Sequence, residues 1–145
     1  MFITRECDYA IRIIRELSNG EIKTVREICT MEHIPQQYAY KILKKLERAQ
    51  LVNTYRGAYG GYRLGKEPAE ITLYHILTAV ADNLYVNECL QENYSCPRNT
   101  KHTPCTVHQE CMRLDKLIMT TLQEKTMLDL LNHKDSYQES IGQDI

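Results

Sequence analysis

The feature that most constrains the fold is a glycine-rich, basic segment, NTYRGAYGGYRLGK at residues 53–66, which follows directly on three short helical patterns. Two strand-like pieces lie on either side of a tip formed by Gly57, Gly60 and Gly61, which predicts a β-hairpin. Alone, such a hairpin would indicate little. Placed after three helices, it predicts the wing of a winged helix-turn-helix domain, and hence a mainly α fold with a small β wing.

Three amphipathic helical patterns precede the hairpin, and they cover residues 4–17, 24–31 and 35–50. The first stops at Ser18-Asn19-Gly20, because glycine accepts the left-handed backbone that ends a helix. A capping box of Thr24 and Glu27 opens the second. The short connection between the second and third helices is typical of a helix-turn-helix.

The third helical pattern has a polar face opposite its apolar stripe. Glutamine can address an adenine edge, lysine a guanine or a phosphate, and tyrosine a phosphate or a thymine methyl group. An arginine near the hairpin tip can enter a narrow minor groove. The candidate DNA-binding residues are Gln36, Gln37, Tyr40, Lys41 and Lys44 in the helix and Arg56, Tyr59 and Arg63 in the hairpin. The alternative for the helix is an ordinary solvated face.

Charge divides unevenly along the chain. Residues 1–66 hold 12 Lys and Arg against 7 Asp and Glu, a net +5, whereas residues 67–145 hold 6 against 12, a net −6. Only the first part suits a polyanion such as double-stranded DNA, unless the asymmetry arose by chance. No signal peptide or membrane span is evident, so a cytoplasmic protein without a membrane partner is expected. No paired carboxylates, nucleophile–base pair or phosphate-cradling loop indicates an enzyme.

The second half of the chain carries two more helical patterns around an irregular segment. We expect the DNA-binding domain to cover 1–82, with a last short helix capped by Thr72, then a cysteine-bearing loop over 83–104, a helix over 105–132 and a flexible tail over 133–145. A helix as long as 105–132 cannot be buried by so small a domain. A second copy is therefore expected to pack on it, which predicts a homodimer through a long C-terminal dimerisation helix.

Four of the six cysteines lie in the second half, in the pattern Cys89-x6-Cys96-x8-Cys105-x5-Cys111, and His108 falls between the last two. Thiolates with one imidazole suit an iron–sulfur cluster or zinc. The long spacings, unlike the short CxxC pairs usual in structural zinc sites, favour a cluster held by a loop. A structural zinc site, a reversible thiol–disulfide switch and cysteines without a ligand role are the alternatives.

The other two cysteines, Cys7 and Cys29, fall in helical patterns of the DNA-binding domain. Because small, semi-apolar cysteines commonly pack in cores, we expect both to be core residues.

Three segments together resemble a known family: DYAIR at 8–12, LVNTYRGAYGGYRLGK at 51–66, and the cysteine loop. The chain resembles the IscR, NsrR and CymR family of winged helix-turn-helix transcription regulators over nearly its whole length, to about Asn132, with IscR the nearest match. The resemblance implies a DNA-binding repressor whose affinity is set by an iron–sulfur cluster that senses redox state, nitric oxide or iron–sulfur status. A cluster-free, CymR-like regulator controlled by a small molecule or a partner protein is the alternative.

The resemblance also implies a ligand set. Cys89, Cys96 and Cys105 match the three cluster cysteines of IscR, and His108 matches the histidine that completes a 2Fe–2S site; a 4Fe–4S cluster is the other possibility. The spacings here are longer than in IscR or NsrR, and Cys111 is an additional thiol. Asp8 matches an aspartate that reaches the cluster from the partner subunit in NsrR-like proteins. The expected fourth ligand is His108, Cys111 or Asp8, in that order.

Overall fold

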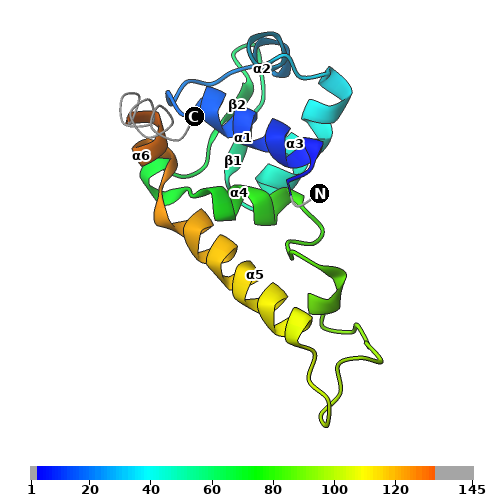
Figure 1. The fold of residues 1–145 in the computed structure, drawn as a ribbon. Coiled ribbons are helices and arrows are strands. Elements are labelled where there is room, and N and C mark those ends of the chain that lie inside the picture. Colours follow the sequence, from blue (N-terminus) through cyan, green and yellow to red (C-terminus); the bar gives the residue numbers. More distant parts are fainter. Residues whose placement is uncertain (1–2, 133–145) are drawn as a thin grey trace, which may run out of the picture.

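The computed structural model describes residues 3–132, which form a compact head and a projecting arm (Figure 1). The predicted tail, 133–145, lies outside the described residues. In chain order the elements are α1 (Arg5–Leu17), α2 (Val25–Glu32), α3 (Gln36–Arg48), β1 (Val52–Tyr55), β2 (Gly61–Leu64), η1 (Pro68–Glu70), α4 (Leu73–Val80), η2 (Glu88–Leu90), α5 (Thr106–Glu124) and α6 (Met127–Asn132). We call residues 3–82 with α6 the head, and residues 83–124 the arm. No helix within residues 3–132 has both the length and the apolar character needed to cross a membrane.

Local signals in the sequence place the head helices within one or two residues of their expected bounds. α1 ends before Gly20, whose φ of 81° is left-handed. The capping box of Thr24 and Glu27 is present at the start of α2, and Thr72 caps α4. Pro35 is the cap of α3 rather than its first residue. These signals set the ends of the four helices α1 to α4.

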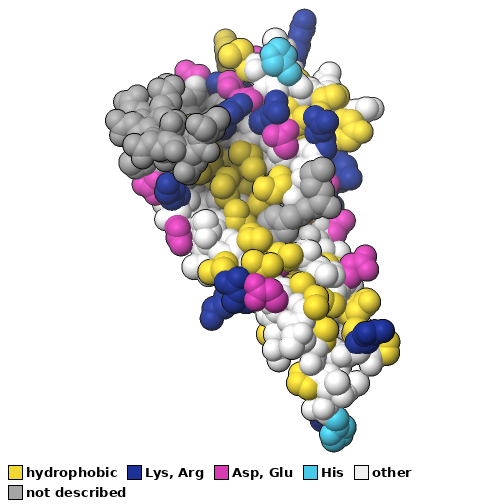
Figure 2. Space-filling model, viewed as in Figure 1, with side chains coloured by type: hydrophobic (Ala, Val, Ile, Leu, Met, Phe, Trp, Pro, Cys, Tyr) yellow, Lys and Arg dark blue, Asp and Glu magenta, His cyan; other side chains and the backbone are white. Residues whose placement is uncertain are grey.

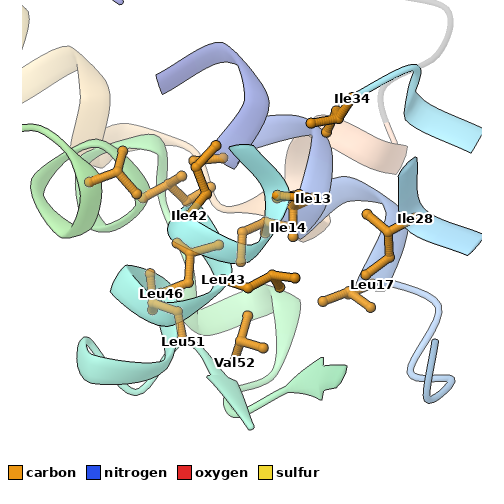
Figure 3. Close-up of a cluster of buried hydrophobic side chains, with 14 of the residues drawn as sticks. Ile13, Ile14, Leu17, Ile28, Ile34, Ile42, Leu43, Leu46, Leu51 and Val52 are labelled. Atoms are coloured by element: carbon orange, nitrogen blue, oxygen red, sulfur yellow. The ribbon is translucent and has the colours of Figure 1, made fainter. Parts of the chain in front are cut away.

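The core of the head lies between α1, α3 and α4, and it is built from the apolar stripes of these helices (Figure 3). Ile13, Ile14, Ile42 and Leu43 are fully buried there. Cys7 belongs to this core as predicted, whereas Cys29 is only half-buried and packs against its edge. Burying the stripe of α3 leaves its polar face exposed to solvent.

β1 and β2 form the predicted wing, an antiparallel hairpin in which Val52 pairs with Leu64 and Tyr55 with Gly61. A third backbone segment joins it. Lys23, in the connection between α1 and α2, exchanges two backbone hydrogen bonds with Tyr62, with N···O distances of 2.9 and 2.7 Å. The head is therefore a winged helix in which strand β2 of the wing is attached to the connection between α1 and α2.

The last helix differs from the prediction of one helix over 105–132, because the chain breaks after Glu124 and restarts as α6. At the start of α6, the Thr126 hydroxyl accepts from the Asp129 backbone amide at 3.2 Å, and the Asp129 carboxylate accepts from the Thr126 backbone amide at 2.9 Å. The Met127 amide donates to the Ile71 carbonyl at 2.7 Å. The Met127 side chain enters the core of the head. The apolar pattern did not reveal this break, since apolar residues occur on both sides of it, Leu122 before and Leu128 after. The 19 residues of α5 span about 28 Å.

The seating of α6 gives a stability prediction. Met127 is 3% exposed, whereas its neighbour Leu128 is 42% exposed. Met127→Ala is expected to lower the free energy of unfolding by about 2–3 kcal/mol, since it leaves a cavity between α6 and the head. The matched control, Leu128→Ala, should lower it by less than about 0.5 kcal/mol. Urea denaturation followed by circular dichroism measures both, and equal losses would contradict the seating of α6.

Candidate nucleic-acid interface and metal centre

The exposed face of α3 carries the helical residues predicted to bind DNA. Ala39, Ile42, Leu43 and Leu46 are buried, so the opposite side of the helix faces solvent. All five predicted helical residues are exposed: Gln36, Gln37, Tyr40, Lys41 and Lys44. The Gln36 amide donates to the Tyr40 hydroxyl at 3.4 Å, which aligns two of them along the helix. This face has the chemistry and the accessibility of a groove-reading surface.

A groove runs between α3 and the wing, and three predicted residues line it: Tyr40, Lys44 and Arg56. Three residues that sequence reasoning missed complete the lining, namely Glu47, Thr54 and Tyr62. The Thr54 hydroxyl donates to the Glu47 carboxylate at 2.6 Å. This bond connects the wing to α3, which is the recognition helix of the predicted helix-turn-helix. The spacing of Tyr40, Lys44 and Glu47 is that of one helix face, so this signal was available in the sequence.

Tyr62 enters the same groove as a neutral phenol. Partial burial raises the pKa of Tyr62 above its usual value, and the nearby Tyr40 and Glu47 raise it further. A neutral phenol can donate a hydrogen bond to a phosphate oxygen.

The remaining predicted hairpin residues lie outside this groove. Tyr59 projects from the wing tip and is 96% exposed. Arg63 is exposed but neighbours Tyr62 in β2, and successive strand residues point to opposite faces. Arg63 lines a different hollow, beside Ser18 and Leu128. The structure therefore groups Arg56 with the recognition helix and separates Arg63 from it.

Lys45 connects the recognition helix to the point where the arm begins. Its ammonium lies 3.0 Å from the Glu6 carboxylate of α1 and donates to the Val80 carbonyl at 2.8 Å. Asp82, the residue immediately before the arm, lies 3.9 Å away. The sequence does not reveal this connection, because contacts over 35 residues of separation leave no periodic signal.

Side chains of α5 and of the loop hold the arm together. The Asp115 carboxylate accepts from the Val86 amide at 3.0 Å, and the Asn87 amide lies 3.8 Å from the Cys111 sulfur. The side-chain Oδ1 of Asn99 accepts from the Cys105 backbone amide at 3.0 Å. These bonds fold the segment 83–104 back against α5, so that its cysteines approach those of the helix.

The four cysteines of the second half gather around Cys89. Partial burial raises the pKa of the Cys89 thiol, and the hydrogen-bonded thiol of Cys111 raises it further, as do the thiols of Cys96 and Cys105. All four cysteines are half-buried and carry free thiols. The fold thus places in one region of the arm the four thiols that the sequence separates by up to 22 positions, close enough for the other three to affect the pKa of Cys89.

His108 faces the same region. It lines a hollow with Cys89 and Cys96, and its Nδ1 atom is buried without a hydrogen-bond partner within residues 3–132. A buried ring nitrogen without a partner costs free energy unless a ligand or water satisfies it. Asp8, by contrast, has a partner in its own chain, since its carboxylate lies 3.0 Å from Arg12 on α1.

These donors fit an iron–sulfur cluster by their chemistry, because cysteine thiolates are the usual protein ligands of such clusters and imidazole replaces thiolate in some of them. The unpartnered Nδ1 of His108 beside the thiols is the observation that supports the fit. Within the described ranges, no three His, Cys, Asp or Glu side chains are already placed to hold a single metal ion. Cluster binding therefore requires the loop 83–104 to close further onto α5.

Comparison with known proteins agrees with this description. The profile of the Rrf2 family, described as an iron-dependent transcriptional regulator, matches residues 3–133. The HTH-type transcriptional regulator NsrR of Halalkalibacterium halodurans is 26% identical over 148 residues, with 95% of each chain covered. The global cysteine regulator CymR of B. subtilis has a similar structure, with a TM-score of 0.72, 25% identity, and 92% of this chain and 98% of that chain covered. IscR of T. potens has a TM-score of 0.69 at 21% identity, with coverages of 94% and 90%.

Proposed function

The chain belongs to the Rrf2 family of DNA-binding transcriptional regulators, which are not enzymes, and on that premise we propose that it is a cytoplasmic repressor controlled by an iron–sulfur cluster. The observation that carries the proposal is that four thiols and His108 share one region of the arm, and that the Nδ1 atom of His108 is buried without a hydrogen-bond partner within residues 3–132. The basic groove between α3 and the wing supplies the DNA-binding half of the proposal.

Cys89, Cys96 and Cys105 are the proposed cluster ligands, and the fourth is His108, Cys111 or Asp8, in that order. His108 comes first because its buried Nδ1 has no hydrogen-bond partner among residues 3–132, whereas Asp8 is paired with Arg12. A cluster bound there, 2Fe–2S or 4Fe–4S, would supply a centre that changes with redox state, nitric oxide or iron supply. The ligand thiols must lose their protons on binding, and the loop must close on α5.

The exposed face of α5 supports a homodimer. Val107, Leu114 and Leu117 are 66%, 38% and 51% exposed, and hydrophobic side chains are visible along the arm (Figure 2). No helix of the head covers this face at the outer end of the arm (Figure 1). A second copy of the same helix would bury the apolar side chains in a symmetric contact. Light scattering on the purified protein tests this directly.

Such a dimer would place two recognition helices in successive major grooves of a near-palindromic site, with the wings at the flanking minor grooves. Lys45 would couple the arm to the DNA-binding face of α3, since its ammonium contacts Val80 and Asp82 just before the arm begins. Ordering of the loop on ligation would change the position of that junction. DNA affinity would then respond as a two-state coupling between the arm and the head.

Anaerobic purification, an absorption spectrum, and iron and sulfide assays test the proposal. A coloured protein with iron and sulfide in equal amounts is the expected result. A colourless protein with stoichiometric zinc would indicate a structural zinc site. A colourless, metal-free protein would indicate a cluster-free regulator controlled by a small molecule or a partner protein. The last alternative is favoured by the absence of a preformed metal-ligand group within residues 3–132.

Arg56 gives a prediction for the DNA-binding half. Because Arg56 is exposed at the wing and lines the groove beside α3, Arg56→Ala is expected to weaken binding to the selected site by about 1–3 kcal/mol. Lys101→Ala is the control, since it removes one positive charge from the arm. Fluorescence anisotropy at physiological salt measures both affinities. Unchanged affinity of Arg56→Ala would exclude a role for this side chain in site binding.

A further inference from the structure

We propose that Tyr59, at the wing tip, reads the minor groove beside the operator and favours A·T over G·C pairs there. The inference deepens the proposed function and rests on it. It assigns to one side chain a sequence preference that the recognition helix cannot provide.

The first observation is the exposure of Tyr59. At 96% it is the most exposed large hydrophobic side chain of the described residues; the next is Val107 at 66%. Within residues 3–132 no hydrogen bond or ring contact of its side chain is found. A single exposed aromatic residue is common on proteins. Because Tyr59 lies at the end of a wing proposed to face DNA, its exposed side chain is free to contact the DNA.

The second observation is that the tip holding Tyr59 is a well-defined turn. The Gly60 amide donates to the Gly57 carbonyl at 3.0 Å, so that Ala58 and Tyr59 form the corner of the turn. The strand pair begins immediately afterwards, with Gly61 opposite Tyr55. Since Lys23 also pairs with Tyr62, three residues after Tyr59, the turn stands on a strand that is fixed to the body of the head.

The third observation is the nearby charge. Arg56 is exposed three residues before Tyr59, on the strand side of the same turn. The minor groove is narrow and strongly negative over A·T-rich DNA, where it attracts arginine. A wing directed there by Arg56 would bring the Tyr59 ring between the two sugar–phosphate walls.

The chemistry of a phenol then determines which base pairs it accepts. A·T and T·A pairs both offer acceptors in the minor groove, adenine N3 and thymine O2, whereas G·C adds the guanine N2 amino group. The Tyr59 hydroxyl can donate to either acceptor, and the apolar ring can pack against the sugars. The guanine amino group projects into the space that the ring would occupy, so G·C pairs would be disfavoured.

The experiment begins by selecting sites from a random pool of duplex DNA with the wild-type protein. A·T enrichment is expected in the segments flanking the conserved half-sites. Duplexes with A·T, G·C or I·C pairs in these flanks are then compared. Inosine lacks the N2 amino group, so I·C resembles A·T in the minor groove and G·C in the major groove. Wild type should bind A·T and I·C flanks about 5- to 10-fold more tightly than G·C flanks.

Variants assign the preference to Tyr59. Tyr59→Ala should lower the ratio of A·T to G·C affinity to the smaller part that Arg56 contributes, and Tyr59→Phe should retain the part that comes from the ring. Tyr94→Ala, which removes an exposed tyrosine from the arm, should leave the ratio unchanged. Because the readout is a ratio, a general loss of affinity cancels. A wild-type ratio in Tyr59→Ala overturns the proposal, and failure to enrich any site overturns the proposed function instead.

Discussion

Cys89→Ser is expected to remove nearly all iron and sulfide from the anaerobically purified protein. The thiols of Cys111, Cys96 and Cys105 all lie near enough to Cys89 to raise the pKa of its thiol. Loss of an outer-shell partner alone typically lowers metal affinity 10- to 100-fold, so loss of this ligand should exceed about 100-fold. The visible absorption of the cluster and any cluster-dependent change in DNA affinity should disappear together.

Cys29→Ser is the matched control, because Cys29 is a half-buried thiol of α2 in the head. It should retain full iron and sulfide and the wild-type spectrum. Far-ultraviolet circular dichroism of Cys89→Ser should match wild type, which separates loss of ligation from loss of fold. Wild-type iron content in Cys89→Ser would show that Cys89 is not a ligand, and equal loss in Cys29→Ser would show that the effect is unspecific.

The fourth ligand follows from the same assay. His108→Ala should lower iron content or shift the spectrum, because its buried Nδ1 lies beside the thiols without another partner. Cys111→Ser should retain the cluster if His108 is the ligand. The opposite pattern would assign the position to Cys111, whose sulfur contacts Cys89 and Asn87.

The helices and the wing could be predicted because their signals are local. Thr24 and Glu27 are three residues apart and satisfy each other's backbone amides, so the start of α2 is encoded in four residues. The division of the last helix could not be predicted in this way. It depends on a backbone bond between Met127 and Ile71, which lie 56 positions apart. Periodicity along one helix contains no information about such a contact.

In the candidate site, too, local features could be predicted from the sequence and long-range contacts could not. Residue type and spacing predicted the exposed face of α3 and the cysteines of the arm, since both follow from short-range patterns. The contacts that join these parts come from distant positions: Lys45 with Glu6 and Val80, and Glu47 with Thr54. Charged residues are common on any solvated helix, so nothing in the sequence distinguished Lys45 from its neighbours.

Gly61→Ala is expected to have the largest effect on the stability of the head. A Cβ atom at this position would lie 2.5 Å from the Lys23 carbonyl oxygen and 2.7 Å from its carbon. The backbone φ of Gly61 is also 153°, which side chains rarely allow. The close approach permits the two hydrogen bonds between Lys23 and Tyr62 that attach the wing to the body.

Backbone strain and the loss of these two bonds together should lower the free energy of unfolding by about 3–5 kcal/mol. The melting temperature should fall by roughly 10 °C or more. Gly20→Ala is the matched control: its φ of 81° is equally unsuited to alanine, but its Cβ would meet no atom within 4 Å. It should lose only about 1–2 kcal/mol. DNA affinity, measured below the melting transition, should fall in Gly61→Ala and not in Gly20→Ala. If the two variants lose the same stability, contact between the wing and Lys23 does not stabilise the head.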